Sequence, residues 1–231
     1  KGAVLGIGWS LLYPLLMLLV MKLVFTQFFG RATPHYTIYL FAGNLIFSYF
    51  SEATKGGMTS LMENAKIFTK VDVPKYIFLF SKNVQTFIGF LLTLVLFFIF
   101  VAFDGLAFSW KFLMLLYPTV LLLAFNIGVG LILSALYVFF RDTKYLYDVF
   151  LKLLMYASAI FYNIDGYDRS VQYIFLINPV YLFIRYFRKI VIDGAIPSLW
   201  FHLLMAADAA IVLGLGCWMY KKYNHRFLFY V

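Results

Sequence analysis

Long apolar segments separated by short charged stretches make up most of the chain. Residues 83–103 and 112–140 contain no Asp, Glu, Lys or Arg. Each is long enough for a helix to cross a bilayer, which takes about 20 apolar residues. Residues 5–25 form another such segment, interrupted only by Lys22, whose long side chain can reach the interface. These segments predict membrane-spanning helices.

Three further segments are less uniformly apolar. Residues 36–54 are dense in Phe, Tyr and Leu and carry Glu52 near their end, at headgroup level. Residues 145–163 include Asp148 and Lys152, spaced so that they can pair on one helix face. Residues 199–220 carry one carboxylate, Asp208, near the middle. Together the segments predict six spans, at residues 5–25, 36–54, 78–103, 112–140, 145–163 and 199–220.

Residues 170–184 are apolar but too short to cross a bilayer, and they contain Pro179. Such segments are typically re-entrant or interfacial. We expect two short helices that dip into the outer leaflet around Asn178 and Pro179. The predicted fold is an all-α membrane protein, with one transmembrane domain over residues 1–231.

The composition supports lipid as the solvent. Hydrophobic residues make up 64% of the chain and charged residues 13%, whereas soluble domains have about 25% charged residues. The formal net charge of +9 then fits loops that face anionic headgroups, and we expect no nucleic-acid partner. Cys217 is the only cysteine, so an intrachain disulfide is impossible.

The distribution of basic residues predicts the orientation. Six spans place both termini on one side. Ten Lys and Arg residues fall on that side, namely Lys1, Lys55, Lys66, Lys70, Lys75, Arg141, Lys144, Lys221, Lys222 and Arg226. Six fall on the other, namely Arg31, Lys111, Arg169, Arg185, Arg188 and Lys189. Positive charge favours the cytoplasmic side, so both termini are expected there.

Motifs for catalysis are absent from the sequence. The patterns GxxxxGK[ST], HExxH and GxSxG do not occur, and His35, His202 and His225 are widely separated. We therefore expect no catalytic residue, no metal site and no cofactor in this chain.

The loop after the second predicted span contains a capping-box pattern, Ser60-Leu-Met-Glu63. It predicts a short helix over residues 61–69, before Pro74, that carries Glu63, Lys66 and Lys70. A cytoplasmic helix between two spans can dock a soluble partner. The alternative is a capped surface helix whose charges are only solvated.

Several short motifs in this order resemble the permeases of ABC-2 type polysaccharide exporters, which carry teichoic acid, O-antigen and related cell-surface glycans. The resemblance covers residues 1–231. It rests on Lys1 to Gly6 with Trp9, Tyr13 to Leu16, Tyr39 to Gly43, Asn64 to Lys70, Val73 to Lys75, Gly128 to Gly130, Phe140 to Asp142, Ala159 to Tyr162, Asn178-Pro179, and Tyr186 to Arg188. One departure is Ala159, where many family members have proline before Ile-Phe-Tyr.

The resemblance implies a homodimer of six-span subunits in the bacterial plasma membrane, bound to two copies of a separate ATPase that holds ATP and Mg. It implies that the capped loop, with Ser60, Glu63, Lys66 and Lys70, is the coupling helix. The implied substrate is a lipid-linked glycan, moved from the cytoplasmic to the outer face for cell-wall biogenesis.

Aromatic residues make up 22% of the chain, and some of them suit a sugar channel. Sugar C–H groups pack on aromatic rings, and Tyr hydroxyls bond sugar hydroxyls. Trp9 and Tyr13 share a helix face beside Pro14, and Tyr156, Phe161 and Tyr162 approach the outer end of the fifth predicted span. We predict these five as channel lining; the alternative is ordinary packing and interface anchoring.

Asp208 supports a different hypothesis. A carboxylate at span depth is costly and is a functional candidate by default. A proton-coupled secondary transporter would use Asp208 as a relay. A membrane scaffold without transport is a third possibility that hydropathy leaves open.

Overall fold

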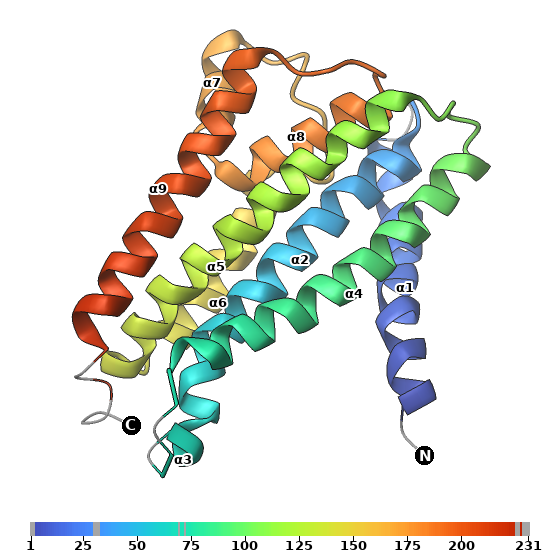
Figure 1. Cartoon of the computed structure of the whole chain (residues 1–231). Helices are drawn as coiled ribbons and strands as arrows, with labels where there is room; N and C mark the ends of the chain where they lie inside the picture. Colours follow the sequence, from blue (N-terminus) through green and yellow to red (C-terminus); the bar gives the residue numbers. More distant parts are fainter. Residues whose placement is uncertain (1–2, 30–32, 69, 72, 225–226, 228–231) are drawn as a thin grey trace. The chain divides into compact units, whose positions relative to one another are not determined.

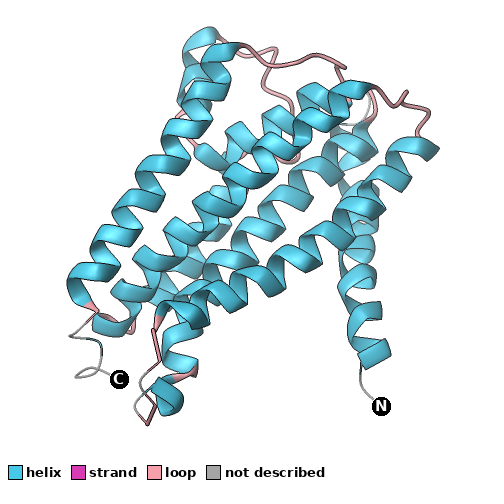
Figure 2. Ribbon diagram, in the orientation of Figure 1, coloured by secondary structure: helices cyan, strands magenta, loops and turns pink. Residues whose placement is uncertain are grey.

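The computed structural model describes residues 3–29, 33–68, 70–71, 73–224 and 227, apart from the side chains of residues 3–11 and Phe68. Every regular element in this part of the chain is a helix (Figure 1), and Figure 2 shows loops as the only other structure. The all-α prediction is therefore confirmed for the described residues.

Four segments among the described residues are long and apolar enough to cross a membrane. They are α1 (Ala3–Phe29), α4 (Tyr76–Phe103), the 3-10 helix η1 (Trp110–Leu115) with α5 (Leu116–Phe139), and α9 (Leu199–Tyr223). They coincide with the predicted spans at 5–25, 78–103, 112–140 and 199–220. The protein is thus a multi-pass membrane protein.

The other two predicted spans differ in length from their helices. Helix α2 (Tyr36–Glu63) continues past the predicted end at residue 54. Helix α6 (Thr143–Ala157) is only 15 residues long, and the predicted end at residue 163 is wrong because the chain leaves the helix after Ala157. At a rise of about 1.5 Å per residue, α6 is shorter than the hydrocarbon core. The bilayer crossing of α2 and α6 stays a prediction.

Three short helices complete the fold, α3 (Ala65–Phe68), α7 (Arg169–Leu176) and α8 (Pro179–Val191). Helices α7 and α8 confirm the two short helices expected around Asn178 and Pro179. The side chain of Asn178 accepts from the amide of Val180 at 3.0 Å and so caps α8. Pro179 fits the first turn because its missing amide would have no helical partner there.

The chain divides into two compact units. The first comprises Lys1–Ser48, Ile88–Pro118 and Leu154–Ser198, and the second comprises Tyr49–Phe87, Thr119–Leu153 and Leu199–Val231.

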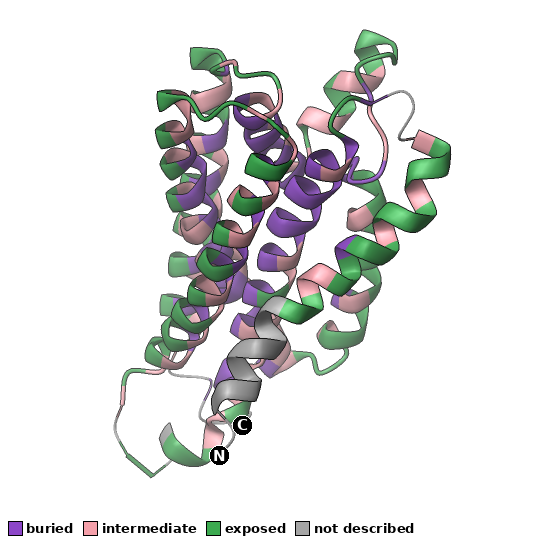
Figure 3. Cartoon of the chain, turned by 90° about the vertical axis from the view of Figure 1, so that its right-hand side faces the viewer, coloured by how far each residue is buried: buried purple, intermediate pink, exposed green. Residues whose placement is uncertain are grey.

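Helix α8 lies in the core of the first unit. Ten of its 13 residues are buried, and it packs on η1 and α7. Phe41 of α2 packs edge-on against Phe97 and Phe100 of α4, with both ring centroids 5.4 Å away. Helix α1, in contrast, is exposed along most of its described length (Figure 3). The first unit therefore combines a packed centre with an apolar helix that has little cover.

The second unit is built by close helix packing. Leu61, Leu79, Leu131 and Val138 belong to one buried cluster. The hydroxyl of Tyr147 on α6 donates to Thr54 of α2 at 2.6 Å. Asp148 forms a salt bridge with Lys55 of α2 at 2.7 Å, so the expected Asp148–Lys152 pairing within one helix is wrong. The partner is on another helix because α6 packs against α2 along this face.

Candidate functional site

Arg188 of α8 is a buried cation that holds the chain just after α6. Its Nη1 donates to the carbonyl of Ala159 at 2.8 Å, and its Nη2 to that of Ile160 at 2.9 Å. Its Nε and Nη2 also donate to the carbonyl of Tyr39, at 3.2 and 3.0 Å. The guanidinium carbon lies 3.3 Å from the centroid of the Tyr39 ring. Burial lowers the pKa of Arg188, but arginine stays charged in proteins.

Two tyrosines of α2 bond the next two carbonyls along the chain. The hydroxyl of Tyr36 donates to the carbonyl of Phe161, and that of Tyr39 to the carbonyl of Tyr162, both at 2.7 Å. These carbonyls lie beyond Ala157, the last residue of α6, where helical amides are no longer available. Side chains therefore replace the helix amides, and we call residues 159–162 the clamped loop.

Asn178 joins the start of α8 to the end of α6. Its side-chain amide donates to the carbonyl of Ala157 at 3.2 Å and to the hydroxyl of Ser158 at 2.9 Å. The same side chain caps α8 through its oxygen. One residue thus fixes the start of α8 and the exit from α6 together.

Gly43 of α2 leaves the space that the Arg188 guanidinium occupies. A Cβ on Gly43 would lie 2.8 Å from Arg188 Nη2 and 3.3 Å from the Cα of Ile160. Both distances are below ordinary van der Waals contact, and one of them involves backbone. A residue without a side chain is therefore required for α2 to approach the clamped loop this closely.

Four of the motifs noted in the sequence meet here: Tyr39 to Gly43, Ala159 to Tyr162, Asn178-Pro179, and Tyr186 to Arg188. Each contributes contacts to the clamped loop or to its supports. The convergence gives a structural reason for their presence together.

Ala159 adopts a backbone angle that proline cannot reach. Its φ is 49° and it is fully buried, whereas proline is fixed near −65°. We expect Ala159→Pro to disrupt the clamped loop and to lower the free energy of unfolding by about 3 kcal/mol or more. Ala159→Gly should be neutral or stabilise slightly, because a left-handed conformation costs about 1–2 kcal/mol for a residue with a Cβ. Thermal unfolding in detergent measures both, and equal melting temperatures for the two variants would contradict the assigned geometry.

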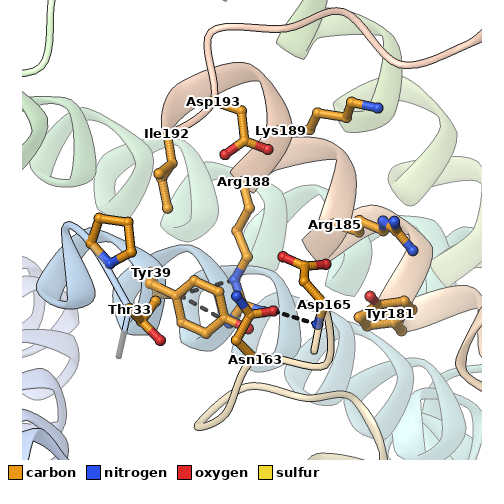
Figure 4. Close-up of a pocket in the computed structure, with 11 residues that line it drawn as sticks. Thr33, Tyr39, Asn163, Asp165, Tyr181, Arg185, Arg188, Lys189, Ile192 and Asp193 are labelled. Carbon is orange, nitrogen blue, oxygen red and sulfur yellow. Dashed lines mark hydrogen bonds between the residues drawn. The ribbon is translucent and has the colours of Figure 1, made fainter. Parts of the chain in front are cut away.

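A polar pocket of about 240 Å³ opens beside the clamped loop. Figure 4 shows Arg185, Arg188 and Lys189 of α8 around it, with Asp165 and Asp193 on the neighbouring loops. The pKa of Asp193 is raised above its usual range, first by desolvation and then by the Asp165 carboxylate. Lys189 and Arg185 offset part of this rise. The pocket therefore presents basic side chains that donate hydrogen bonds and carboxylates that accept them.

Three of the predicted channel residues lie together. Phe161 is buried and stacks on Phe25 of α1, with ring centroids 4.4 Å apart, and its ring lies 5.9 Å from that of Tyr156. The hydroxyl of Tyr162 donates to the carbonyl of Tyr156 at 2.7 Å. Tyr162 also lies 6.5 Å from the ring of Phe29. Phe161 is thus covered by neighbouring side chains in this structure, whereas Tyr156 is 59% exposed.

The other two predicted channel residues, Trp9 and Tyr13, lie on α1. Tyr13 is 54% exposed, on a helix whose described face is largely uncovered. Trp9 lies within α1, but its side chain is outside the described residues. The role of all five aromatic residues stays a prediction.

The capping box predicted at Ser60 is wrong. Helix α2 continues through Ser60, which is buried and donates its hydroxyl to the carbonyl of Gly57 at 2.7 Å. Inside a continuous helix its amide is already bonded, so Ser60 cannot act as an N-cap. The helix ends instead at Glu63, and the side-chain amide of Asn64 donates to the Ser60 carbonyl at 2.8 Å.

The short helix expected over residues 61–69 is therefore α3, over Ala65–Phe68, with Thr69 outside the described residues. Lys66 and Lys70 are exposed beside it. Glu63 lies 3.7 Å from the ammonium of Lys82 on α4, in a solvent-exposed ion pair. The loop thus keeps an exposed basic surface, although its local structure differs from the prediction.

Asp208 is half-buried within α9. Over the part of the chain described, it makes no hydrogen bond or ion pair, and no group of three His, Cys, Asp or Glu residues could hold a metal. Among the described residues, therefore, none is bonded to Asp208 so as to relay a proton from it, and the role of Asp208 stays a hypothesis.

Comparisons with known proteins agree with the resemblance noted in the sequence. The family model "ABC-2 type transporter" matches residues 1–192. An O-antigen export system permease protein RfbA of Klebsiella pneumoniae is 24% identical over 98% of this chain and 88% of its own length. The protein of the same name from Myxococcus xanthus is 26% identical over the same shares. The chain belongs to the ABC-2 type transporter family, as a non-catalytic membrane permease.

Proposed function

We propose that this chain is the membrane subunit of an ATP-driven exporter of lipid-linked polysaccharide, with residues 1–231 acting as one transmembrane domain. The observation that carries the proposal is similarity over 98% of the chain to permeases named for O-antigen export. The substrate is a cell-surface glycan of the O-antigen or teichoic acid class, moved outward across the bacterial plasma membrane.

The energy for transport comes from a partner. ABC-2 permeases pair with ABC ATPase subunits, where ATP and Mg would bind. We place this partner against α3 and its exposed Lys66 and Lys70, as a coupling helix between two spans. The excess of basic residues on the same side supports a cytoplasmic location for this loop and for both termini.

Exposed apolar faces support a homodimer. On α6 they form a stripe at helical spacing, made of Tyr145, Leu146, Val149, Phe150, Leu153 and Tyr156, each 49% exposed or more. The stripe offers an apolar surface for a protein partner on α6, a helix that at 15 residues is shorter than a full span. A second copy of the permease would cover this stripe. The complete exporter would then be a permease homodimer with two ATPase subunits.

The clamped loop supports the aromatic side chains at the end of α6 in a fixed position. Arg188, Tyr36 and Tyr39 satisfy four successive carbonyls, so the loop can lie at membrane depth without leaving these carbonyls unpaired. This arrangement holds Tyr156 and Tyr162 beside the end of α6, with α7 and α8 proposed as re-entrant helices of the outer leaflet. Weak stacking contacts from such rings suit a polymer that must slide.

Co-purification and deletion test the proposal. The tagged chain, purified from its own cells, should retain an endogenous ATPase, and its deletion should remove one class of surface glycan. Recovery without any ATPase, together with unchanged surface glycans, would refute the exporter assignment and favour the secondary-transporter or scaffold hypotheses.

The exposed tyrosines offer a test of the glycan path. We expect Tyr13→Ala and Tyr156→Ala to slow export while the melting temperature stays unchanged, because both side chains are more than half exposed. Phe161→Ala should instead destabilise the protein by about 3–5 kcal/mol, the cost of truncating a buried phenylalanine. Export and detergent melting are measured on the same variants.

Trp200→Ala is the matched control, since Trp200 is 81% exposed and lies outside the predicted path. It should leave export unchanged. If Tyr13→Ala and Tyr156→Ala export as well as this control, neither tyrosine contacts the glycan.

A further inference from the structure

The second unit carries a groove that the proposed glycan path does not use. Leu131 of α5 and Tyr220 of α9 are buried and form its floor. Its walls are Tyr76 and Phe80 at the start of α4, and Cys217, Lys221 and Asn224 at the end of α9. The volume is about 570 Å³, within the usual range of roughly 300–1,000 Å³ for ligand pockets.

The body of the groove is apolar and faces outward. Tyr76 and Phe80 pack edge to face, with ring centroids 6.1 Å apart, and are 50% and 43% exposed. Helices α4 and α9 are both candidate membrane spans, and lipid is the expected neighbour of exposed rings on such helices. An acyl chain matches this lining, whereas a sugar would find few polar partners along it.

The end of the groove is basic. Lys221 lines it. The adjacent Lys222 lies outside the lining, with its ammonium 4.8 Å from the ring of Trp218 and 5.7 Å from that of Tyr223. The ammonium of Lys75, before α4, donates to the carbonyl of Asn224 at 2.8 Å. One lysine therefore lies in the groove and two more lie near the end of α9, beside a tryptophan of the type found at headgroup level. This end of the groove complements an anion.

Tyr220 adds a polar group that the described residues leave unsatisfied. Tyr220 is 6% exposed, and its hydroxyl is buried without a hydrogen-bond partner among the described residues. Buried hydroxyls are normally bonded, so an acceptor from outside would complete this one. In a glycerophospholipid, ester carbonyls lie between the phosphate and the acyl chains, at the level where Tyr220 adjoins Lys221.

We propose that this groove binds one glycerophospholipid with an anionic headgroup. The acyl chain lies along Tyr76, Phe80 and Leu131, an ester carbonyl accepts from the hydroxyl of Tyr220, and the phosphate lies at Lys221, with the charge of the adjacent Lys222 nearby. This site is independent of the proposed export function, since it needs no glycan and no ATPase.

Lipid retention provides the first test. The full chain is placed in nanodiscs of phosphatidylglycerol or phosphatidylcholine, and lipids retained on release are counted by native mass spectrometry. Wild type should retain one phosphatidylglycerol in preference to phosphatidylcholine. The double change Lys221→Gln and Lys222→Gln should lower this retention about tenfold or more, since each lysine near a lipid phosphate contributes roughly a factor of five.

The matched control removes the same charge elsewhere, through Lys144→Gln and Lys152→Gln on the exposed surface of α6. It should retain lipid as wild type does. Equal retention of the two lipids by wild type, or equal loss in both double variants, would overturn the proposal. Tyr220→Phe, which removes only the hydroxyl, should also weaken retention, and it keeps the test valid if the lysine variant does not fold.

Cys217 provides the second test because it lines the groove and is the only cysteine. Its alkylation by N-ethylmaleimide should be slower in phosphatidylglycerol than in phosphatidylcholine nanodiscs, and Tyr220→Phe should reduce the difference. Equal alkylation rates in both lipids would mean that the groove does not prefer the anionic lipid, and the lipid site would be withdrawn.

Discussion

Replacing Arg188 with methionine is expected to lower the free energy of unfolding by about 2–6 kcal/mol and to abolish export. The carbonyls of Ala159 and Ile160 lie outside any helix and receive their short hydrogen bonds from this guanidinium. Each buried carbonyl that loses its partner costs about 1–3 kcal/mol. Methionine has a similar length and no donor, so the change removes the bonds without leaving a large void. Melting in detergent and surface glycan export are the two measurements.

Arg185→Met is the matched control on the same helix. Arg185 is only partly buried at the edge of the polar pocket, and its guanidinium carbon lies 6.0 Å from the ring of Tyr181. This change should cost less than about 1 kcal/mol, as expected for a partly exposed side chain. Arg188→Lys should fall between the two, because an ammonium cannot reproduce the planar fork that bonds two neighbouring carbonyls. Equal melting temperatures for the two methionine variants would show that Arg188 does not hold the clamped loop.

The spans at α1, α4, α5 and α9 could be predicted because a run of about 20 apolar residues indicates a membrane-spanning helix, whatever the helix contacts. The end of α6 could not be predicted in this way. Residues 158–163 are mostly apolar, and hydropathy does not distinguish a helix from a loop whose carbonyls are bonded by distant side chains. The partner that decides the matter, Arg188, is 29 residues away from Ala159 along the chain.

The same limit explains the error at Ser60. The Ser-x-x-Glu spacing fits a capping box, but a cap forms only where a helix begins. Packing keeps α2 helical through this point, with Ser60 buried. The signal for the clamped loop was nevertheless in the sequence. Arg188 stands among the large apolar residues of the segment Tyr181 to Ile190, and a buried arginine there needs acceptors, which carbonyls outside helices can supply.

Gly128→Ala is expected to lower the free energy of unfolding by about 1–3 kcal/mol, the usual cost of overpacking. A Cβ on Gly128 of α5 would lie 2.7 Å from both the backbone nitrogen and the Cα of Leu213 on α9. A Cβ on Gly216, one turn along α9, would lie 2.5 Å from the carbonyl oxygen of Gly128. The obstacles are backbone atoms, which cannot rotate away as a flexible side chain can. Helices α5 and α9 would have to separate.

Small residues commonly allow such close approach between membrane helices, where dispersion replaces the hydrophobic effect as the driving force. Gly214→Ala is the control because Gly214 lies on α9, two residues before Gly216, and a Cβ there would meet nothing within 4 Å. Alanine is the better helix former by about 1 kcal/mol, so this variant should melt at or above the wild-type temperature. The double variant Gly128→Ala and Gly216→Ala should cost less than the sum of the single changes, because one separation of α5 from α9 relieves both contacts. Strict additivity would mean that the two glycines do not share an interface.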